Sequence, residues 1–287
     1  MFDHRDSIFR TMFVGSFLVL MLAPLTVQAA EPAAEPAMQI IKTPKGTRLG
    51  LFGTKPAAPA PTLFVFAAGV DDMDKNRFYA HTGKRLAEQG WIYVTLDPPC
   101  HEADILADEP AGLGGWAHRV KNGQNLMQPF VERCVDALNY LIVEGFTDPA
   151  QVAATGTSRG GFCALHFAAG EPRVRAVAAV SPVTNLLALR EFAELTQEQV
   201  GPWGISALSE KLAGRAVWLS VGNDDQRVST DDCVTLARAL VAQSRKQKPD
   251  LKVVPVELLV GPSDGHHALD GAYDLAAVFI QKWSPRQ

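Results

Sequence analysis

Short apolar runs alternate with amphipathic helical patterns along most of this chain of 287 residues. That alternation is typical of a parallel β-sheet whose strands are joined by helices packed on its faces. Residues 62–68 form a continuous apolar run, as a strand buried on both faces requires. Apolar positions at three- and four-residue spacing predict a helix over residues 127–142. We therefore expect an α/β fold with a mostly parallel central sheet flanked by helices.

The remaining expected elements extend this pattern without an internal repeat, so we expect one large domain. They are an antiparallel pair of strands over residues 40–52, strands over 91–96, 152–155, 174–180, 216–221 and 253–260, helices over 76–89, 161–167 and 272–283, and a helix that starts at 229–232.

Two connections are long for such a fold. Residues 100–121 have no period of their own and are expected to arch over a site as a loop. Residues 184–213 form an insert that we interpret as a small lid. We expect Trp116 of the loop and Phe192 and Trp203 of the insert to contact the substrate. Packing of the insert onto the body explains the two insert residues equally well.

The first residues have the composition of an export signal. Arg5 and Arg10 precede an uncharged apolar stretch over residues 12–27, and small or medium residues follow up to Ala29. This predicts a signal peptide over residues 1–29, a flexible spacer over 30–38 and a folded domain over 39–287. Secretion or a periplasmic location follows, and an uncleaved membrane anchor is the alternative.

Composition excludes some classes of protein and restricts others. With 47% apolar and 20% charged residues the chain is globular, and a net charge of −4 supplies no electrostatic basis for binding nucleic acid. The four cysteines lack metal-ligand spacing. Cys134 and Cys163 are expected to be buried. Whether Cys100 forms a disulfide is left open by the sequence. We expect neither a metal nor an organic cofactor.

The segment Gly156-Thr157-Ser158-Arg159-Gly160 has a strand pattern before it and a helical pattern after it. A sharp strand-to-helix turn needs glycines where the two elements nearly touch, and it exposes the serine at its apex. The helix leaves the Arg159 amide without an internal partner, so that amide can stabilise an oxyanion beside Ser158. The segment therefore predicts a nucleophilic serine.

A nucleophilic serine needs a histidine as base and an acid that orients the histidine. After the strand that ends at residue 221 come Asp224 and Asp225, and after the next strand come His266 and His267. The order serine, acid, histidine along parallel strands is typical of one fold superfamily.

The chain resembles the α/β hydrolases over essentially all of its length after the signal, and most closely their branch of dienelactone hydrolases and prolyl-oligopeptidase-like enzymes. The motifs Gly222-x-x-Asp225-x-Arg227-Val228 and Gly265-His266 carry this resemblance. It implies that Asp225 is the acid and His266 the base, with Asp224 and His267 as the alternatives.

The turn after the strand over residues 62–68 should supply a second amide for the oxyanion. We expect Val70 to be this donor, with Gly69 as the alternative. The Arg159 side chain can meet a substrate carboxylate or pair with a nearby acid such as Asp71, Asp97 or Glu102. We favour the pairing with an acid.

We therefore expect an exported serine hydrolase, a carboxylesterase acting on a small-molecule ester through an acyl-serine intermediate. A peptidase, amidase or acyltransferase with the same three residues is one alternative. A catalytically silent hydrolase fold that only binds ligands is the other.

Overall fold

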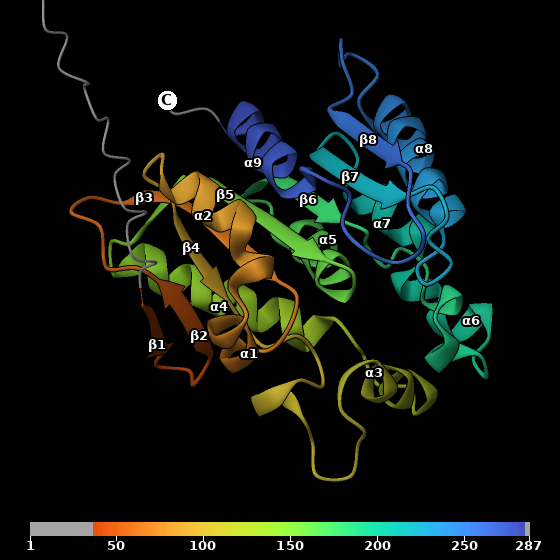
Figure 1. Ribbon diagram of the computed structural model, residues 1–287, viewed down its shortest axis with the longest axis horizontal. Helices are drawn as coiled ribbons and strands as arrows, with labels where there is room; N and C mark the ends of the chain where they lie inside the picture. The colour runs from red at the N-terminus through yellow and green to blue at the C-terminus, as the bar shows by residue number, and fades with distance from the viewer. Residues whose placement is uncertain (1–36, 285–287) are drawn as a thin grey trace, which may run out of the picture. The chain divides into compact units, whose positions relative to one another are not determined.

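The computed structural model describes residues 37–284, which are built around one eight-stranded sheet in the order β1-β2-β4-β3-β5-β6-β7-β8 (Figure 1). The pairs β1–β2 and β2–β4 are antiparallel, and all other neighbours are parallel. The predicted α/β fold with a mostly parallel sheet is thereby confirmed. The strands are β1 (Met38–Lys42), β2 (Arg48–Phe52), β3 (Ala60–Phe66), β4 (Ile92–Thr95), β5 (Thr147–Thr157), β6 (Val174–Val180), β7 (Ala216–Gly222) and β8 (Val256–Gly261).

Helices cover both faces of the sheet because its central strands are apolar on both sides. In β3, Phe64 and Phe66 belong to one core cluster, and Leu63 and Val65 to the other. The first cluster contains buried residues of α4, α5 and α8, and the second contains those of α2 and α9. The helices are α1 (Val70–Lys75), α2 (His81–Ala87), α3 (Gly112–Lys121), α4 (Gln128–Val143), α5 (Arg159–Gly170), α6 (Gln197–Val200), α7 (Ile205–Lys211), α8 (Thr230–Gln247) and α9 (Ala272–Trp283).

The predicted loop over residues 100–121 is wrong in its second half, which is the helix α3. Glycines weaken a helix, so the run Gly112-Leu113-Gly114-Gly115 gives no helical signal. Packing overrides that preference, because Trp116 and Val120 are buried in the core. Gly115 is required there, since an added Cβ would collide with the Pro110 carbonyl and with Cys100.

The predicted helix over residues 76–89 is broken. It consists of a 3-10 turn (Arg77–Ala80) followed by α2, and the Asn76 side chain caps the turn by accepting a hydrogen bond from the Phe78 amide at 3.2 Å. The helix expected to start at 229–232 is α8, and the Ser229 side chain accepts a hydrogen bond from the Asp232 amide at its first turn.

The insert over residues 184–213 is made of short helical segments that include α6 and α7. Phe192 and Leu208 from this insert are buried in the same core cluster as the body of the protein. Figure 1 shows α3 and α6 on the side toward which the arrowheads of the strands point, the carboxyl edge of the sheet. The insert is therefore part of the wall around that edge.

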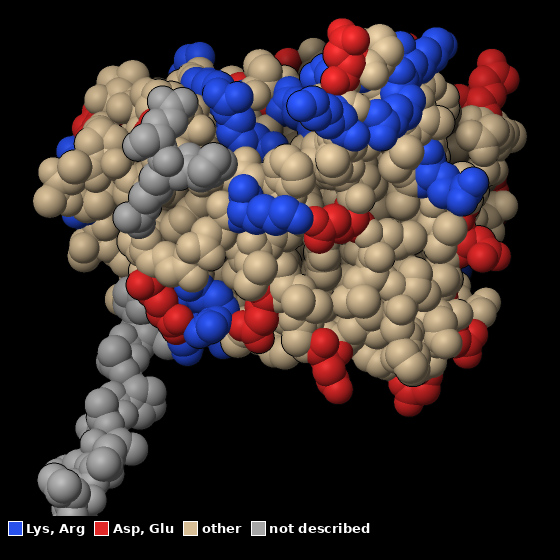
Figure 2. All heavy atoms as spheres, turned by 90° about the horizontal axis from the view of Figure 1, so that it is seen from above, with Lys and Arg blue, Asp and Glu red and all other residues tan. Residues whose placement is uncertain are grey.

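Figure 2 shows the face that lies uppermost in Figure 1, where α9 and β8 are found. Lys and Arg gather toward one border of this face, and uncharged side chains cover much of its middle. Leu258 and Val260 of β8 and Leu275 and Val278 of α9 are exposed apolar residues. Within residues 37–284, no helix is long and apolar enough to span a bilayer. The expected signal peptide, residues 1–29, and most of the expected spacer lie outside the described residues.

Candidate active site

Ser158 stands at the turn between β5 and α5, as the sequence predicts. Its backbone has φ 55° and ψ −120°, a conformation that residues with a side chain rarely adopt. An added Cβ at Gly156 would collide with the Gly160 carbonyl, and one at Gly160 with the Phe66 carbonyl. The two glycines therefore allow the sharp turn that places the Ser158 hydroxyl at the carboxyl edge of the sheet.

His266 lies between Ser158 and Asp225. Its Nε2 is 2.9 Å from Ser158 Oγ, and its Nδ1 is 2.8 Å from Asp225 Oδ2. Ser158 follows β5, Asp225 follows β7 and His266 follows β8, so three strand ends converge on one point. The arrangement lets the imidazole accept the hydroxyl proton while the carboxylate holds the ring in the required tautomer.

Asp225 is held in place by its own loop and is 1% exposed. Its Oδ1 accepts hydrogen bonds from the amides of Arg227 and Val228 at 3.1 and 3.2 Å, and its amide donates to Thr230 Oγ1 at 3.2 Å. Both carboxylate oxygens are thus occupied, one by backbone and one by His266. This fixes the direction in which the acid faces the histidine.

The neighbouring residues that the sequence left as alternatives make other contacts. Asp224 is exposed, and its carboxylate accepts a hydrogen bond from the Gln226 side chain at 2.8 Å. The His267 side chain is 49% exposed and lies 3.5 Å from Asp264. Of the two pairs, the structure therefore brings Asp225 and His266 to Ser158.

The expected use of Val70 as oxyanion donor is wrong. The Val70 amide donates to the buried Asp97 Oδ1 at 2.7 Å and is not available to a substrate. The turn over residues 67–69 precedes it, and Ala67 lines the pocket beside Ser158. Gly69, the alternative donor in the same turn, stays a candidate. The other expected donor, the Arg159 amide, is the first of α5.

The expected ion pair of Arg159 with a nearby acid is also wrong, because Arg48 occupies that position. Arg48, at the start of β2, binds Asp97 at 3.5 Å and Glu102 at 3.1 Å, and it also pairs with Asp71. Burial raises the pKa of Asp97, and the hydrogen bond from Val70 and the charge of Arg48 oppose that rise. The Arg159 guanidinium instead donates from Nε to the Ala67 carbonyl at 3.0 Å.

A pocket of about 440 Å³ opens beside Ser158. Aromatic rings form part of its wall: Phe78 and Tyr273 meet edge to face with ring centroids 5.4 Å apart, and Tyr79 lies next to them. The Tyr273 hydroxyl is 3.2 Å from Thr157 Oγ1, next to the serine. The lining residues are Ala67, Phe78, Tyr79, Leu113, Thr157, Ser158, Arg159, Ser181, Arg227, His266, His267, Ala268 and Tyr273.

The three residues expected to contact the substrate do not line this pocket. Trp116 is fully buried, and its indole donates to the Pro99 carbonyl at 2.6 Å. Phe192 is fully buried and Trp203 is 9% exposed, both in the main core. The packing interpretation therefore holds for the insert. The sequence did not lead us to expect the aromatic side of the pocket, which consists of Phe78, Tyr79 and Tyr273. A signal for it was present, because Phe78 and Tyr79 are adjacent in the sequence shortly after the turn that follows β3.

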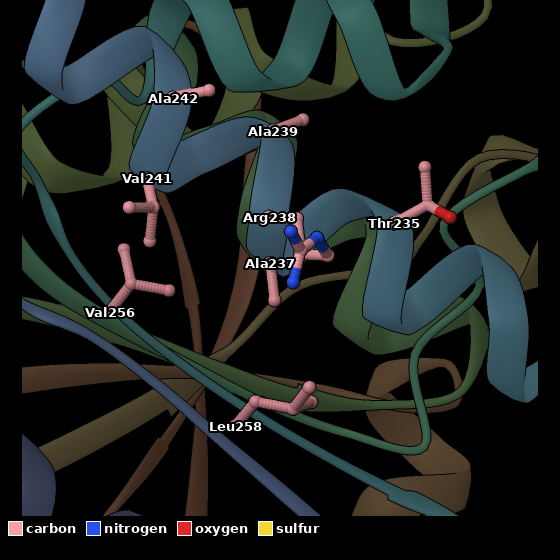
Figure 3. A pocket seen from close by; sticks show the side chains of 8 residues that line it. All are labelled: Thr235, Ala237, Arg238, Ala239, Val241, Ala242, Val256 and Leu258. Atoms are coloured by element: carbon pink, nitrogen blue, oxygen red, sulfur yellow. The ribbon is translucent and has the colours of Figure 1, made fainter.

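A second hollow lies between α8 and β8 (Figure 3). Its lining is mostly small or aliphatic, with Arg238 as the one charged residue, and it contains no serine, histidine, cysteine or acid. Its residues are Thr235, Ala237, Arg238, Ala239, Val241, Ala242, Val256 and Leu258. Because this groove offers no reacting group, we place the candidate active site at Ser158.

Within residues 37–284, neither the cysteines nor a cluster of metal-ligating side chains forms a second reactive centre. All four cysteines are free and buried, so the disulfide considered at Cys100 is absent. Burial raises the pKa of the Cys100 thiol to about 12, which leaves it unreactive at neutral pH. In the part of the chain that the structure describes, no group of three or more His, Cys, Asp or Glu residues is placed to hold a metal ion.

A mostly parallel eight-stranded sheet with a serine at a strained strand-to-helix turn defines an α/β hydrolase of the serine hydrolase type. The chain belongs to the prolyl oligopeptidase family, whose profile matches residues 112–283, more than half of its length. The chain is also 28% identical over 136 residues to acylamino-acid-releasing enzyme 2 of Oryza sativa subsp. japonica. That match spans 46% of this chain and only 16% of the rice enzyme.

Solved structures share the fold. A protein of Thermus thermophilus superposes with a TM-score of 0.65 at 15% identity, covering 87% of this chain and 98% of its own. Acetyl xylan esterase 1 of Thermoanaerobacterium sp. superposes with a TM-score of 0.62 at 17% identity, covering 87% and 88%. At such identities the likeness concerns the fold alone.

Proposed function

We propose that this protein is a carboxylesterase that cleaves its substrate through an acyl-serine intermediate. The observation that carries the proposal is the unbroken series of hydrogen bonds from Ser158 through His266 to the buried Asp225. A serine hydroxyl becomes nucleophilic when a positioned base takes its proton, and this geometry supplies that base.

In the proposed reaction Ser158 Oγ attacks the ester carbonyl and His266 Nε2 accepts its proton. The negative charge that develops on the carbonyl oxygen is stabilised by the Arg159 amide and by an amide of the turn over residues 67–69. His266 then returns the proton to the leaving alkoxide, which departs as the alcohol. Water attacks the acyl-serine by the same path, so ester and water yield acid and alcohol.

The share of each relative's length that this chain covers favours an ester substrate. The chain covers most of the acetyl xylan esterase, whereas it matches a small part of the rice enzyme. Membership of the prolyl oligopeptidase family favours a second candidate, cleavage of an amide or peptide by the same three residues. The two candidates differ in the bond cleaved and share the acyl-serine.

The test uses purified protein with Ser158→Ala as its matched control. We expect a fluorophosphonate probe to label the wild-type protein and not the variant, and short p-nitrophenyl esters to be hydrolysed only by the wild type. Folded wild-type protein that stays unlabelled would contradict the proposal. Equal or higher kcat/KM on p-nitroanilides than on the matching esters would favour the amidase.

We also propose that residues 1–29 direct the chain out of the cytoplasm and are removed. The support is the charge and apolar pattern of those residues. Expression of the full chain, followed by mass spectrometry of the exported protein, should yield a mature form that begins at Ala30. An exported or membrane-bound form that retains Met1 would favour an uncleaved anchor.

A further inference from the structure

Arg159 brings a positive charge into the pocket beside Ser158, and no acid among residues 37–284 forms an ion pair with it. Its guanidinium makes one hydrogen bond, from Nε to the Ala67 carbonyl, and it lies in no ion pair with a carboxylate of residues 37–284. The side chain follows the serine directly in the sequence and is half-buried. The terminal nitrogens of the guanidinium are therefore left to groups outside the described chain.

Asp97 and Glu102, two of the acids expected to pair with Arg159, are committed to other partners. The Glu102 carboxylate accepts hydrogen bonds from the backbone amides of Asp71 and Asp72 at 2.9 and 3.1 Å, and it also forms an ion pair with Arg48. Asp97 is held by Val70 and Arg48 in the same way. Turning either carboxylate toward Arg159 would break hydrogen bonds at the start of α1, so neither acid can readily serve as its counter-ion.

The second arginine of the pocket, Arg227, differs from Arg159 because an acid neutralises its charge. Arg227 Nη2 lies 2.7 and 2.8 Å from the two carboxylate oxygens of Glu191 in the insert, so its charge is balanced. His101, whose ring feels the charge of Arg159, supplies no counter-charge either. Burial and the charge of Arg159 lower the pKa of its ring, which keeps it neutral at pH 7. Of the two arginines that line the pocket, Arg227 is paired with an acid, whereas Arg159 has no acidic partner among residues 37–284.

A half-buried cation loses hydration without gaining a partner, and that loss is recovered when an anion binds. The planar fork of a guanidinium matches a carboxylate, which it can hold with two parallel hydrogen bonds. We infer that Arg159 binds a carboxylate carried by the substrate, so that the preferred esters are anionic, with the charge a few bonds from the scissile carbonyl. The inference rests on the proposed ester hydrolysis and names its substrate class.

The experiment compares esters that differ only in charge. Mono-p-nitrophenyl glutarate and adipate each carry a free carboxylate, and their methyl esters mask it. Spontaneous hydrolysis is subtracted with Ser158→Ala protein as the blank. We expect wild-type kcat/KM to be about tenfold higher on each anionic ester than on its masked form, the gain typical of one charge-assisted pair. The readout is the ratio within each protein, which cancels changes in overall rate.

Substitutions then show which side chain causes the preference for anionic esters. Arg159→Met, which keeps the backbone amide and an unbranched side chain without the charge, should bring the ratio to about one, and Arg159→Lys should leave an intermediate ratio. Arg227→Met is the matched control in the same pocket, and it should retain most of the preference because Glu191 already neutralises Arg227.

An independent measurement needs no variant. A boronic acid forms a reversible adduct with a nucleophilic serine, so 3-carboxyphenylboronic acid should inhibit the wild-type protein about tenfold more strongly than phenylboronic acid. This comparison decides the matter if Arg159→Met does not fold.

Each remaining outcome overturns one specific statement. Equal rates on charged and masked esters, or equal inhibition by the two boronic acids, would refute the carboxylate site and leave the esterase intact. An equal loss on both esters in Arg159→Met would also refute it, and would assign the side chain to the oxyanion. Absence of both labelling at Ser158 and ester hydrolysis would refute the proposed function itself.

Discussion

The Asp97 carboxylate accepts a hydrogen bond from the Val70 amide at 2.7 Å. Asp97 follows β4 and Val70 begins α1, so one buried acid ties the end of a strand to the first turn of a helix. The turn over residues 67–69 lies directly before that helix and lines the pocket through Ala67. Asp97 therefore fixes the turn beside the pocket, where we propose that the oxyanion forms.

Replacing Asp97 should lower turnover, because the turn over residues 67–69 would no longer be held in place. Asp97→Ala leaves the Val70 amide without an acceptor and is expected to reduce kcat about tenfold and destabilise the fold by about 2 kcal/mol. Asp97→Asn keeps an acceptor oxygen and should lose less of both. Steady-state kinetics on a p-nitrophenyl ester and urea unfolding give the two values. If both variants keep wild-type kcat, Asp97 does not position this turn.

Asp225 and Asp224 are adjacent but differ in their contacts, so their substitutions should differ in effect. Asp225→Asn should lower kcat about 10,000-fold, because the amide favours the wrong tautomer of the histidine. Asp224→Asn should leave kcat within about threefold, since its exposed carboxylate contacts only Gln226 among polar side chains. Ester kinetics on both variants check this. A crippled Asp224→Asn with an active Asp225→Asn would reverse the assignment of the acid.

Gly69 leaves no room for a side chain. A Cβ there would collide with the Glu102 carboxyl group, which holds the amides of Asp71 and Asp72. Gly69→Ala should therefore displace the start of α1 and the turn before it, and reduce kcat about ten- to a hundredfold. Gly201→Ala is the control, because a Cβ at Gly201 meets nothing within 4 Å. Similar kinetics for the two variants would show that the turn tolerates the shift.

Glu109 should stabilise the fold at neutral pH and lose that effect in acid. Its hydrogen bond with the buried Arg119 lowers the pKa of the carboxyl from its ordinary value of 4.5 to about 2. Because the folded-state pKa is the lower one, the contribution is complete above pH 4.5 and is lost as pH falls toward 2. Glu109→Gln should therefore cost about 3 kcal/mol at pH 7 and progressively less below pH 4.5.

Urea unfolding of Glu109→Gln and of the wild type between pH 7 and pH 3 measures this difference. Glu88→Gln is the control, since the Arg85–Glu88 pair lies on the surface and should contribute less than about 1 kcal/mol. A cost for Glu109→Gln that stays constant over the whole pH range would mean that its carboxylate charge contributes nothing.

The elements with strong local signals were predictable from the sequence. β6 and α9 lie where the apolar pattern places them, because burial on both faces or along one stripe leaves a regular period. α3 was not predictable, since its glycines oppose a helix and only contacts with distant parts of the chain favour it. The contact between Phe78 and Tyr273 was not predictable for a related reason: the two residues are far apart in the sequence, and only the packing of α9 beside the 3-10 turn Arg77–Ala80 brings them together.

By itself the sequence determined the order of the strands along the chain, the strained turn at Ser158 and the two short segments that hold the acid and the histidine. These features are local, because a turn or a strand depends on residues close together in the chain. Only the tertiary structure decided which of two adjacent acids meets His266, and that Arg48 and not Arg159 neutralises Asp97 and Glu102. The physical reason is that charges and hydrogen-bond donors compete for partners through space. That competition left Arg159 in the pocket without an acid among residues 37–284 as its partner.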